Sequence, residues 1–209
     1  MKSGLTEIIF VIDRSGSMSG IASDVIGGFN EFIKKQREVL EGKLCKVSAY
    51  KFDDVYETIF ENVDLCNVNL LTSKDFEPRG STALLDAVGR TIDNVGLRLY
   101  NTLEEDRPER VLIVVITDGR NNASVEYTIE QVKSKIEQQT QVYNWDFAYI
   151  GANQDAWAVG TGYNVAASST LNYVADSLGV CDMFDKLDKS ITSYRICSTK
   201  KSFNFETDK

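Results

Sequence analysis

The feature that most constrains the fold is an alternation of short, continuously apolar segments with longer segments whose apolar residues recur at helical spacing. The clearest apolar segments are IIFVI at 8–12 and VLIVVI at 111–116. Strands that are apolar throughout are typical of parallel sheets covered on both faces, whose strands are joined by crossover helices. We therefore predict an α/β protein with a Rossmann-like, doubly wound, mostly parallel central sheet and helices on both faces.

The predicted elements follow this alternation along the chain. We expect strands at 6–12, 44–52, 55–63, 109–117, 145–152 and 165–167, and helices at 22–41, 84–99, 124–139, 154–159 and 177–197. Only the turn at Asp53 and Asp54 separates the second strand from the third, so these two are expected to form a hairpin and give the sheet one antiparallel edge strand. Gly42 is expected to end the first helix.

The length of 209 residues suits one domain, predicted at 1–200, followed by a polar and frayed tail at 201–209. The N-terminal sequence enters a strand pattern without a signal-peptide apolar region, and the longest aliphatic run is far too short to cross a bilayer. We therefore expect a cytoplasmic protein without a membrane partner. The net charge of −8, with no basic stripe, also argues against a nucleic-acid partner.

The cysteine and histidine content restricts the chemistry that the chain can perform. The four cysteines are scattered and form no CxxC pair, which argues against a zinc site or a redox motif. There is no histidine, so Ser-His-Asp catalysis, Cys-His catalysis and histidine-ligated metals are excluded. Any bound metal must be held by oxygen, which indicates a hard cation such as Mg²⁺, Mn²⁺ or Ca²⁺.

Two polar loops follow the two most apolar strands. DRSGSMSG at 13–20 follows the first strand, and TDG at 117–119 ends the strand at 109–117. Ligands of doubly wound sheets bind outside the carboxyl ends of the strands, where the strand order reverses, so the two loops are expected to meet. Asp13, Ser15 and Ser17 alternate, and an extended loop can turn all three toward one point.

A cation at this position would have further oxygen ligands within reach. Asp118 would bring a second negative charge, and Thr82, in the segment RGSTALLDA that opens a helix, would supply a fifth protein oxygen. Each of these residues also has a simpler reading, as a turn residue or a helix cap. The dinucleotide fingerprint GxGxxG and the P-loop ending GK[ST] are both absent.

A phosphoryl-transfer enzyme is the alternative function. An aspartate at the end of the first strand, here Asp13, can act as a nucleophile beside Mg²⁺. Enzymes of that kind usually carry a second aspartate two residues further on, and this position is Ser15. The general acid would therefore be missing, which disfavours a Mg²⁺-dependent phosphohydrolase or phosphotransferase.

The three motifs together resemble the metal-ion-dependent adhesion site (MIDAS) of von Willebrand factor A (vWA) domains, of the small stand-alone bacterial or phage type. The resemblance implies a Rossmann-like fold with Mg²⁺ at its top. It implies hydroxyl contacts to the metal from Ser15, Ser17 and Thr82, and direct or water-mediated contacts from Asp13 and Asp118. It also implies a non-enzymatic adaptor or assembly domain, in which one coordination position stays open for an Asp or Glu of a partner protein.

Overall fold

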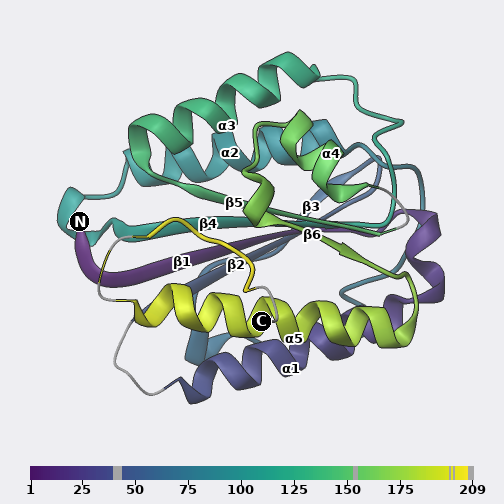
Figure 1. Cartoon of the computed structure of the whole chain (residues 1–209), viewed down its shortest axis with the longest axis horizontal. Helices are drawn as coiled ribbons and strands as arrows, with labels where there is room; N and C mark the ends of the chain where they lie inside the picture. The colour runs from purple at the N-terminus through teal and green to yellow at the C-terminus, as the bar shows by residue number, and fades with distance from the viewer. Residues whose placement is uncertain (40–43, 153–154, 198, 200, 207–209) are drawn as a thin grey trace.

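The computed structural model describes residues 1–39, 44–152, 155–197, 199 and 201–206, which form a three-layer α/β structure (Figure 1). Its six-stranded sheet has the order β3-β2-β1-β4-β5-β6. The strands are β1 (Lys2–Asp13), β2 (Cys45–Phe52), β3 (Tyr56–Asp64), β4 (Pro108–Thr117), β5 (Asp146–Ala152) and β6 (Thr170–Tyr173). All neighbouring pairs are parallel except β2 and β3. The predicted fold class is confirmed, including the single antiparallel edge strand.

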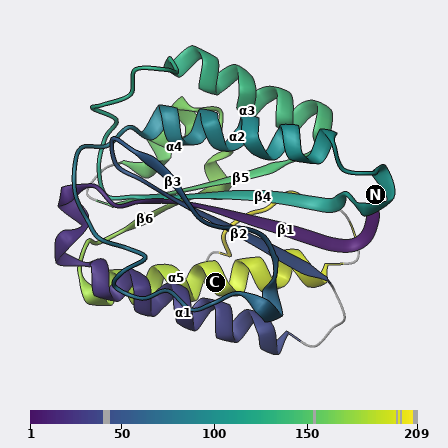
Figure 2. The ribbon, with the colours of Figure 1, turned by 180° about the vertical axis from the view of Figure 1, so that it is seen from behind.

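Helices cover both faces of the sheet, as the two views show (Figures 1 and 2). One face carries α1 (Ala22–Glu38) and α5 (Ser177–Ile196), and the other carries α2 (Leu84–Tyr100), α3 (Ile129–Tyr143) and α4 (Ala156–Gly162). Among the described residues, no helix is both long enough and apolar enough to cross a membrane. The Gly42 expected to end the first helix lies outside the described residues.

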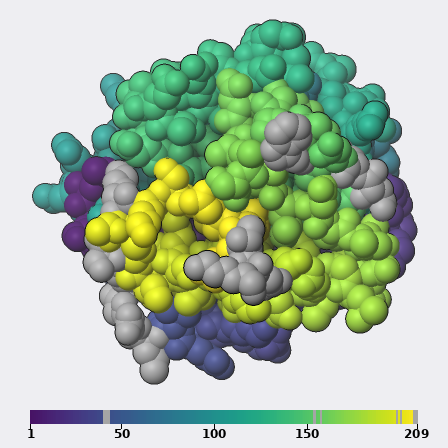
Figure 3. Space-filling view, in the orientation of Figure 1, coloured from purple at the N-terminus to yellow at the C-terminus, as the bar shows by residue number. Residues whose placement is uncertain are grey.

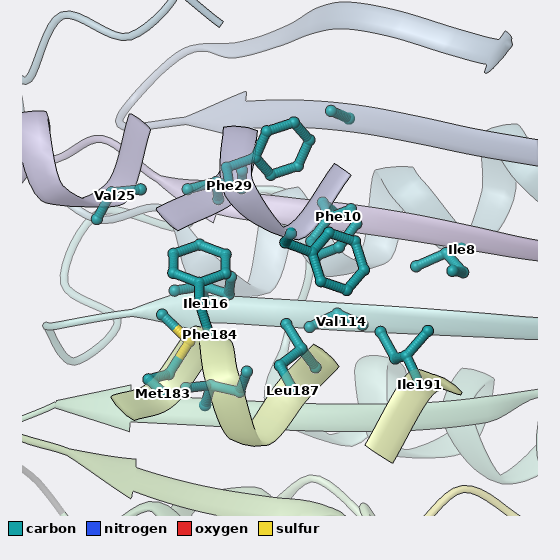
Figure 4. Packing of buried hydrophobic residues seen from close by; sticks show 14 of the residues in the cluster. Ile8, Phe10, Val25, Phe29, Val114, Ile116, Met183, Phe184, Leu187 and Ile191 are labelled. Carbon is teal, nitrogen blue, oxygen red and sulfur yellow. The ribbon is translucent and has the colours of Figure 1, made fainter. Parts of the chain in front are cut away.

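The continuous apolar run of β1 is explained by burial on both sides. Ile8, Phe10 and Ile12 face α1 and α5, whereas Ile9 and Val11 face the other helical layer. On the first side the Phe10 ring packs edge to face against two rings of α1, with centroid distances of 5.1 and 5.4 Å (Figure 4). Such pairs add to the free energy of burial, so β1 is fixed in the centre of the sheet.

The strand order reverses between β1 and β4. From β1 the chain proceeds outward through β2 to β3, and it then returns to place β4 on the opposite side of β1. Asp13 ends β1 beside Phe52, and Thr117 ends β4 beside Gly151. The carboxyl ends of the two central strands are therefore adjacent at one edge of the sheet, on the right in Figure 1.

One helix begins later than the sequence predicts. The predicted helix at 124–139 starts at Ile129, and Val125, which lies within the predicted range, is 90% exposed. The Asp86 carboxylate accepts hydrogen bonds from the backbone N–H groups of 125–127, which holds that segment in a loop. Thr128 and Gln131 then form a capping box that starts the helix.

The predicted strand at 165–167 is wrong. The sixth strand is β6, and residues 167–169 form a single 3-10 turn (η4, Ala167–Ser169) before it. Val165 is buried from a loop, where its N–H binds the carbonyl of Gly160. Val165 is an isolated apolar residue, and its apolar character indicated burial but not a strand.

The C-terminal segment is docked rather than frayed as far as residue 206. Phe203 is 1% exposed, and its ring lies 5.8 Å from that of Tyr194 in α5. The Phe205 N–H donates to the carbonyl of Ser168, and the Phe203 N–H donates to Asp146. Figure 3 shows the segment, in yellow, lying against the body of the molecule. Two aromatic residues in an otherwise polar sequence account for this docking.

Candidate metal centre

The loop after β1 gathers the first three candidate residues. Asp13 is completely buried at the end of β1, and the chain then turns into a short 3-10 helix, η1 (Gly16–Gly20). One Asp13 carboxylate oxygen accepts the Ser15 N–H at 2.7 Å, and the Ser15 and Ser17 hydroxyl oxygens lie 3.1 Å apart. The alternating spacing therefore brings all three side chains to one place.

The loop after β4 joins this cluster through two hydroxyl–carboxylate hydrogen bonds. The Ser17 hydroxyl donates to Asp118 Oδ1 at 2.6 Å. The Thr117 hydroxyl donates to Asp13 Oδ2, also at 2.6 Å. Asp118 thus lies beside the Asp13 loop as expected. The role of Thr117 was not foreseen, because a threonine at the end of a strand carries no signal of its own.

Thr82 reaches the same edge from the segment that precedes α2. It is 3% exposed, and its N–H donates to the side-chain oxygen of Asn122 at 2.8 Å. The side-chain oxygen of Asn121 accepts the Leu85 N–H at 3.4 Å. These two asparagines thus satisfy N–H groups at the start of α2 rather than capping the helix that follows them in the chain. This contact joins the Thr82 segment to the TDG loop.

Gly119 shows how closely the three segments converge. A methyl group on its Cα would lie 3.3 Å from the Thr82 hydroxyl oxygen. The same methyl group would lie 4.0 Å from Asp13 Oδ2 and 4.0 Å from the Ser17 hydroxyl oxygen. Oxygens from three separate parts of the chain thus surround one small space, which a side chain at 119 would fill.

Without a bound cation, the buried negative charges around this space are unfavourable. Burial raises the pKa of Asp13, and the negative charge of Asp118 raises it further, against the hydrogen bonds from Thr117 and Ser15. The Tyr173 hydroxyl at the end of β6 is buried without a hydrogen-bond partner among the described residues. Its pKa is raised by burial and then by the charges of Asp118 and Asp13, so it lies near both. A cation would offset this accumulated negative charge.

The donor set fits a hard, oxygen-ligated cation. It consists of two carboxylates and three hydroxyls, with no sulfur or nitrogen ligand. Within the described ranges, no three Cys, Asp or Glu side chains gather into a metal-binding group, so this site would rely on its hydroxyls as well as its two carboxylates. Neutral hydroxyls with few carboxylates suit Mg²⁺, which keeps part of its water shell, better than a cation that needs a cage of carboxylates.

Several solved structures have the same fold as this chain and match it over most of its length. Proximal thread matrix protein 1 (PTMP1) from the mussel byssus matches with a TM-score of 0.62 and 13% identity, over 90% of this chain and 46% of that one. PTMP1 with a zinc-occupied MIDAS motif gives a TM-score of 0.59 and 14% identity, over 90% and 46%. The ArnB paralog VWA2 from Sulfolobus acidocaldarius gives 0.55 and 15%, over 91% and 45%.

These similarities show the fold, and the chain has the architecture of a vWA domain. At 13–15% identity they do not identify a shared ligand. The chain spans about half the length of these solved chains. No protein-family model matches the sequence, and no curated protein matches it either.

Proposed function

We propose that the chain is a divalent-metal-dependent protein-binding domain of the adaptor or assembly type, acting in the cytoplasm. Asp13, Ser15, Ser17, Thr82 and Asp118 would hold Mg²⁺, with Mn²⁺ or Ca²⁺ as substitutes. The observation that carries the proposal is the convergence of oxygens from three separate segments around the space beside Gly119.

The five proposed ligands would have two different roles in metal binding. Ser15, Ser17 and Thr82 offer neutral hydroxyl oxygens, and Asp13 and Asp118 offer the negative charge. Ser17 now donates to Asp118, and Thr117 donates to Asp13. A serine or threonine hydroxyl can bind a cation with its lone pairs and still donate its hydrogen to a carboxylate. These hydrogen bonds therefore orient the set rather than compete with metal binding.

Partner capture follows from the low charge of the ligand set. When bound, Mg²⁺ would supply an electrophilic coordination position to an incoming carboxylate. The two carboxylates balance the charge of the cation without exceeding it, so the ligand set adds no excess negative charge against a further carboxylate. The −8 charge of the whole chain would repel an acidic partner elsewhere on its surface. Recognition of an Asp or Glu would therefore be confined to this edge of the sheet. A zinc-occupied MIDAS motif in PTMP1 supports a divalent cation on this fold.

The phosphohydrolase alternative gains no support from the geometry. Asp13 is 0% exposed, and both of its carboxylate oxygens already accept hydrogen bonds. A nucleophile must present an oxygen to the substrate phosphorus, and a general acid is also needed. Turnover of an aryl phosphate by the Mg²⁺-loaded protein, lost in Asp13→Asn, would favour the enzyme over the adaptor.

Metal binding is tested by titrating the metal-free protein with Mg²⁺ in a calorimeter. Thr82→Val keeps the shape and burial of Thr82 but removes its hydroxyl, so affinity should fall at least about tenfold while the fold persists. The matched control is Thr91→Val, which removes a buried hydroxyl from the middle of α2, away from the cluster. Equal Mg²⁺ affinity in all three proteins would refute the proposed ligand set.

Partner capture needs a separate test. Proteins retained by the immobilised chain in Mg²⁺ would be identified and compared with those retained in chelator and by the Thr82→Val variant. An adaptor should lose the same partner under both conditions. That partner should also lose binding when one particular Asp or Glu is changed to Asn or Gln. Chelator-resistant capture would contradict a metal bridge even if the metal site is correct.

A further inference from the structure

The Thr82 segment is fixed by two other parts of the chain besides the TDG loop. The Arg79 N–H donates to the Arg14 carbonyl at 2.8 Å, and the Gly16 N–H donates to the Gly80 carbonyl at 3.2 Å. On its other side, the Ala83 N–H donates to the Asp53 carbonyl at 2.9 Å. The segment therefore lies between the Asp13 loop and the β2–β3 turn. The position of Thr82 depends on how these two neighbours are held together.

The buried carboxylate of Asp53, in the β2–β3 turn, joins this turn to the Asp13 loop and to the Thr82 segment. Asp53 is 0% exposed, and its Oδ2 lies 2.9 Å from Arg79 Nε and 3.2 Å from Arg14 Nε. The Arg79 contact is a hydrogen bond, and the Arg14 contact is an ion pair. Asp53 Oδ1 accepts the Val55 N–H at 2.6 Å, which fixes the carboxylate in the turn. Glu57, which is 42% exposed, forms further ion pairs with both Arg14 and Arg79.

The two arginines belong to the two segments that must meet. Arg14 stands between Asp13 and Ser15, and Arg79 lies three residues before Thr82. Both guanidinium groups approach the same buried carboxylate oxygen. Without that charge only the half-exposed Glu57, which is screened by solvent, would offset their repulsion at close range. Arg14 is 3% exposed and could not recover its lost partner from water. Loss of the Asp53 charge would therefore drive the two ligand-bearing segments apart.

The alternative reading of Asp53 as an ordinary turn residue explains only half of its contacts. An Asx turn accounts for the bond from the Val55 N–H to Oδ1. It does not account for complete burial, or for the two arginines on Oδ2.

We propose that Asp53 is a positioning residue for the metal site: through Arg14 and Arg79 it holds the Thr82 segment against the Asp13 loop and thereby sets metal affinity. This inference rests on the proposed metal site. Within the part of the chain that the structure describes, no hydrogen bond or ion pair joins the Asp53 side chain to the five proposed ligands. Its effect is exerted through the distance between Thr82 and the Asp13 loop.

The test compares Mg²⁺ affinity, by calorimetry, in the wild type and in Asp53→Asn. Asparagine retains the turn hydrogen bond but lacks the charge, so we expect affinity to fall at least about tenfold. The matched control is Glu7→Gln. Glu7 is 1% exposed, is paired with Arg98 and lies in β1 like Asp13, about 20 Å along the strand from it. Its loss should leave Mg²⁺ affinity within about twofold.

A second variant and a second measurement keep the positioning role testable if Asp53→Asn does not fold. Arg79 is 56% exposed, so Arg79→Met can be made without disturbing the core, and we expect it to weaken Mg²⁺ binding while Arg79→Lys restores part of it. In the metal-free protein, hydrogen exchange of the Ala83 amide should accelerate in Asp53→Asn and Arg79→Met but not in Glu7→Gln. This readout reports the Thr82 segment without any metal.

The outcomes separate the two proposals. Wild-type affinity in folded Asp53→Asn and Arg79→Met would overturn the positioning role and leave the metal site intact. If Asp53→Asn fails to fold, Arg79→Met decides alone. If the wild type binds no Mg²⁺, the proposed metal site is wrong, and the proposed effect of Asp53 on Mg²⁺ affinity is refuted as well. Equal weakening in Glu7→Gln would show a general loss of stability and would also overturn the positioning role.

Discussion

At the scale of single residues, Asp13 has opposite effects on folding and on metal binding. Its buried charge is costly in the metal-free protein, which is why its pKa is raised. Asp13→Asn removes the charge but keeps the shape. The asparagine oxygen can still accept the Ser15 N–H, and the Thr117 hydroxyl has a second acceptor 3.1 Å away, the Gly119 carbonyl. We therefore expect the variant to raise the melting temperature of the metal-free protein at neutral pH and to abolish stabilisation by Mg²⁺.

Thermal unfolding in chelator and in excess Mg²⁺ checks both halves of this prediction. Ser48→Ala is the control, because it alters a buried polar group of β2 outside the site. It should leave the stabilisation by Mg²⁺ unchanged. An Asp13→Asn protein that is less stable than wild type in chelator would show that the carboxylate charge supports the fold. That result would contradict the electrostatic argument for a cation.

The role of a residue could be predicted from the sequence only where the residues that define this role are close to it in the chain. Asp13, Ser15 and Ser17 stand at alternate positions after an apolar strand, so their convergence can be deduced locally. Asp53 could not be recognised, because its role depends on arginines 39 residues before it and 26 residues after it. The sequence shows two adjacent aspartates in a turn and does not show which of them points inward.

At the scale of elements, the packing of α1 against α5 depends on one close approach. A Cβ at Gly28 would lie 2.2 Å from the Phe184 ring, which is 4% exposed and cannot swing away into solvent. A Cβ at Gly27, one residue earlier in the same helix, would meet nothing within 4 Å. Gly28→Ala should therefore destabilise the protein by about 1–3 kcal/mol through overpacking. Gly27→Ala should stabilise it by about 0.5–1 kcal/mol through helix propensity.

Urea unfolding of the two variants measures this difference directly, since both changes add one methyl group to α1. Similar free energies of unfolding for the two variants would mean that α1 and α5 do not pack as closely as the structure shows. Mg²⁺ affinity should be unchanged in both variants, because neither glycine is among the proposed ligands.

Elements with a continuous signal were predicted well, and those defined by distant partners were not. The strands β1 and β4 carry their own apolar runs, so their centres were located correctly. The start of α3 was misplaced because Asp86, in α2, binds the N–H groups of 125–127 from another part of the chain. β6 was misplaced because four residues at a sheet edge offer too short a pattern to recognise.

At the scale of the whole molecule, the C-terminal segment closes one side of the core. Phe203 contacts Tyr194 and Phe205, and the Ser169 hydroxyl donates to its carbonyl at 2.6 Å. Phe203→Ala should lower the free energy of unfolding by about 3 kcal/mol, which is typical for loss of a buried phenyl ring. Phe205→Ala, at a half-buried position, should cost clearly less. A change of less than about 0.5 kcal/mol for Phe203→Ala would indicate a frayed tail after all.

Metal binding and pH are coupled through the same buried carboxylate, and the coupling has a definite sign. The folded-state pKa of Asp13 lies above its ordinary value of 3.8, so between these two values the metal-free folded protein binds the proton more tightly than the unfolded chain. Its Asp13-dependent stability therefore falls as pH rises through this window. The metal requires the ionised carboxylate, so stabilisation by Mg²⁺ must grow over the same range.

We therefore expect the increase in melting temperature caused by Mg²⁺ to be smaller near pH 4.5 than at pH 7.5. With Mg²⁺ at 100 times its dissociation constant the gain is about 2.7 kcal/mol, or about 5–10 °C for a domain of this size. Melting curves with and without Mg²⁺ across this pH range measure the difference, and Asp13→Asn should show no such increase at any pH. A Mg²⁺ effect that is constant with pH, or greater in acid, would mean that the cation binds without displacing a proton from Asp13. In that case the buried carboxylate would not be the group that draws Mg²⁺ to this edge of the sheet.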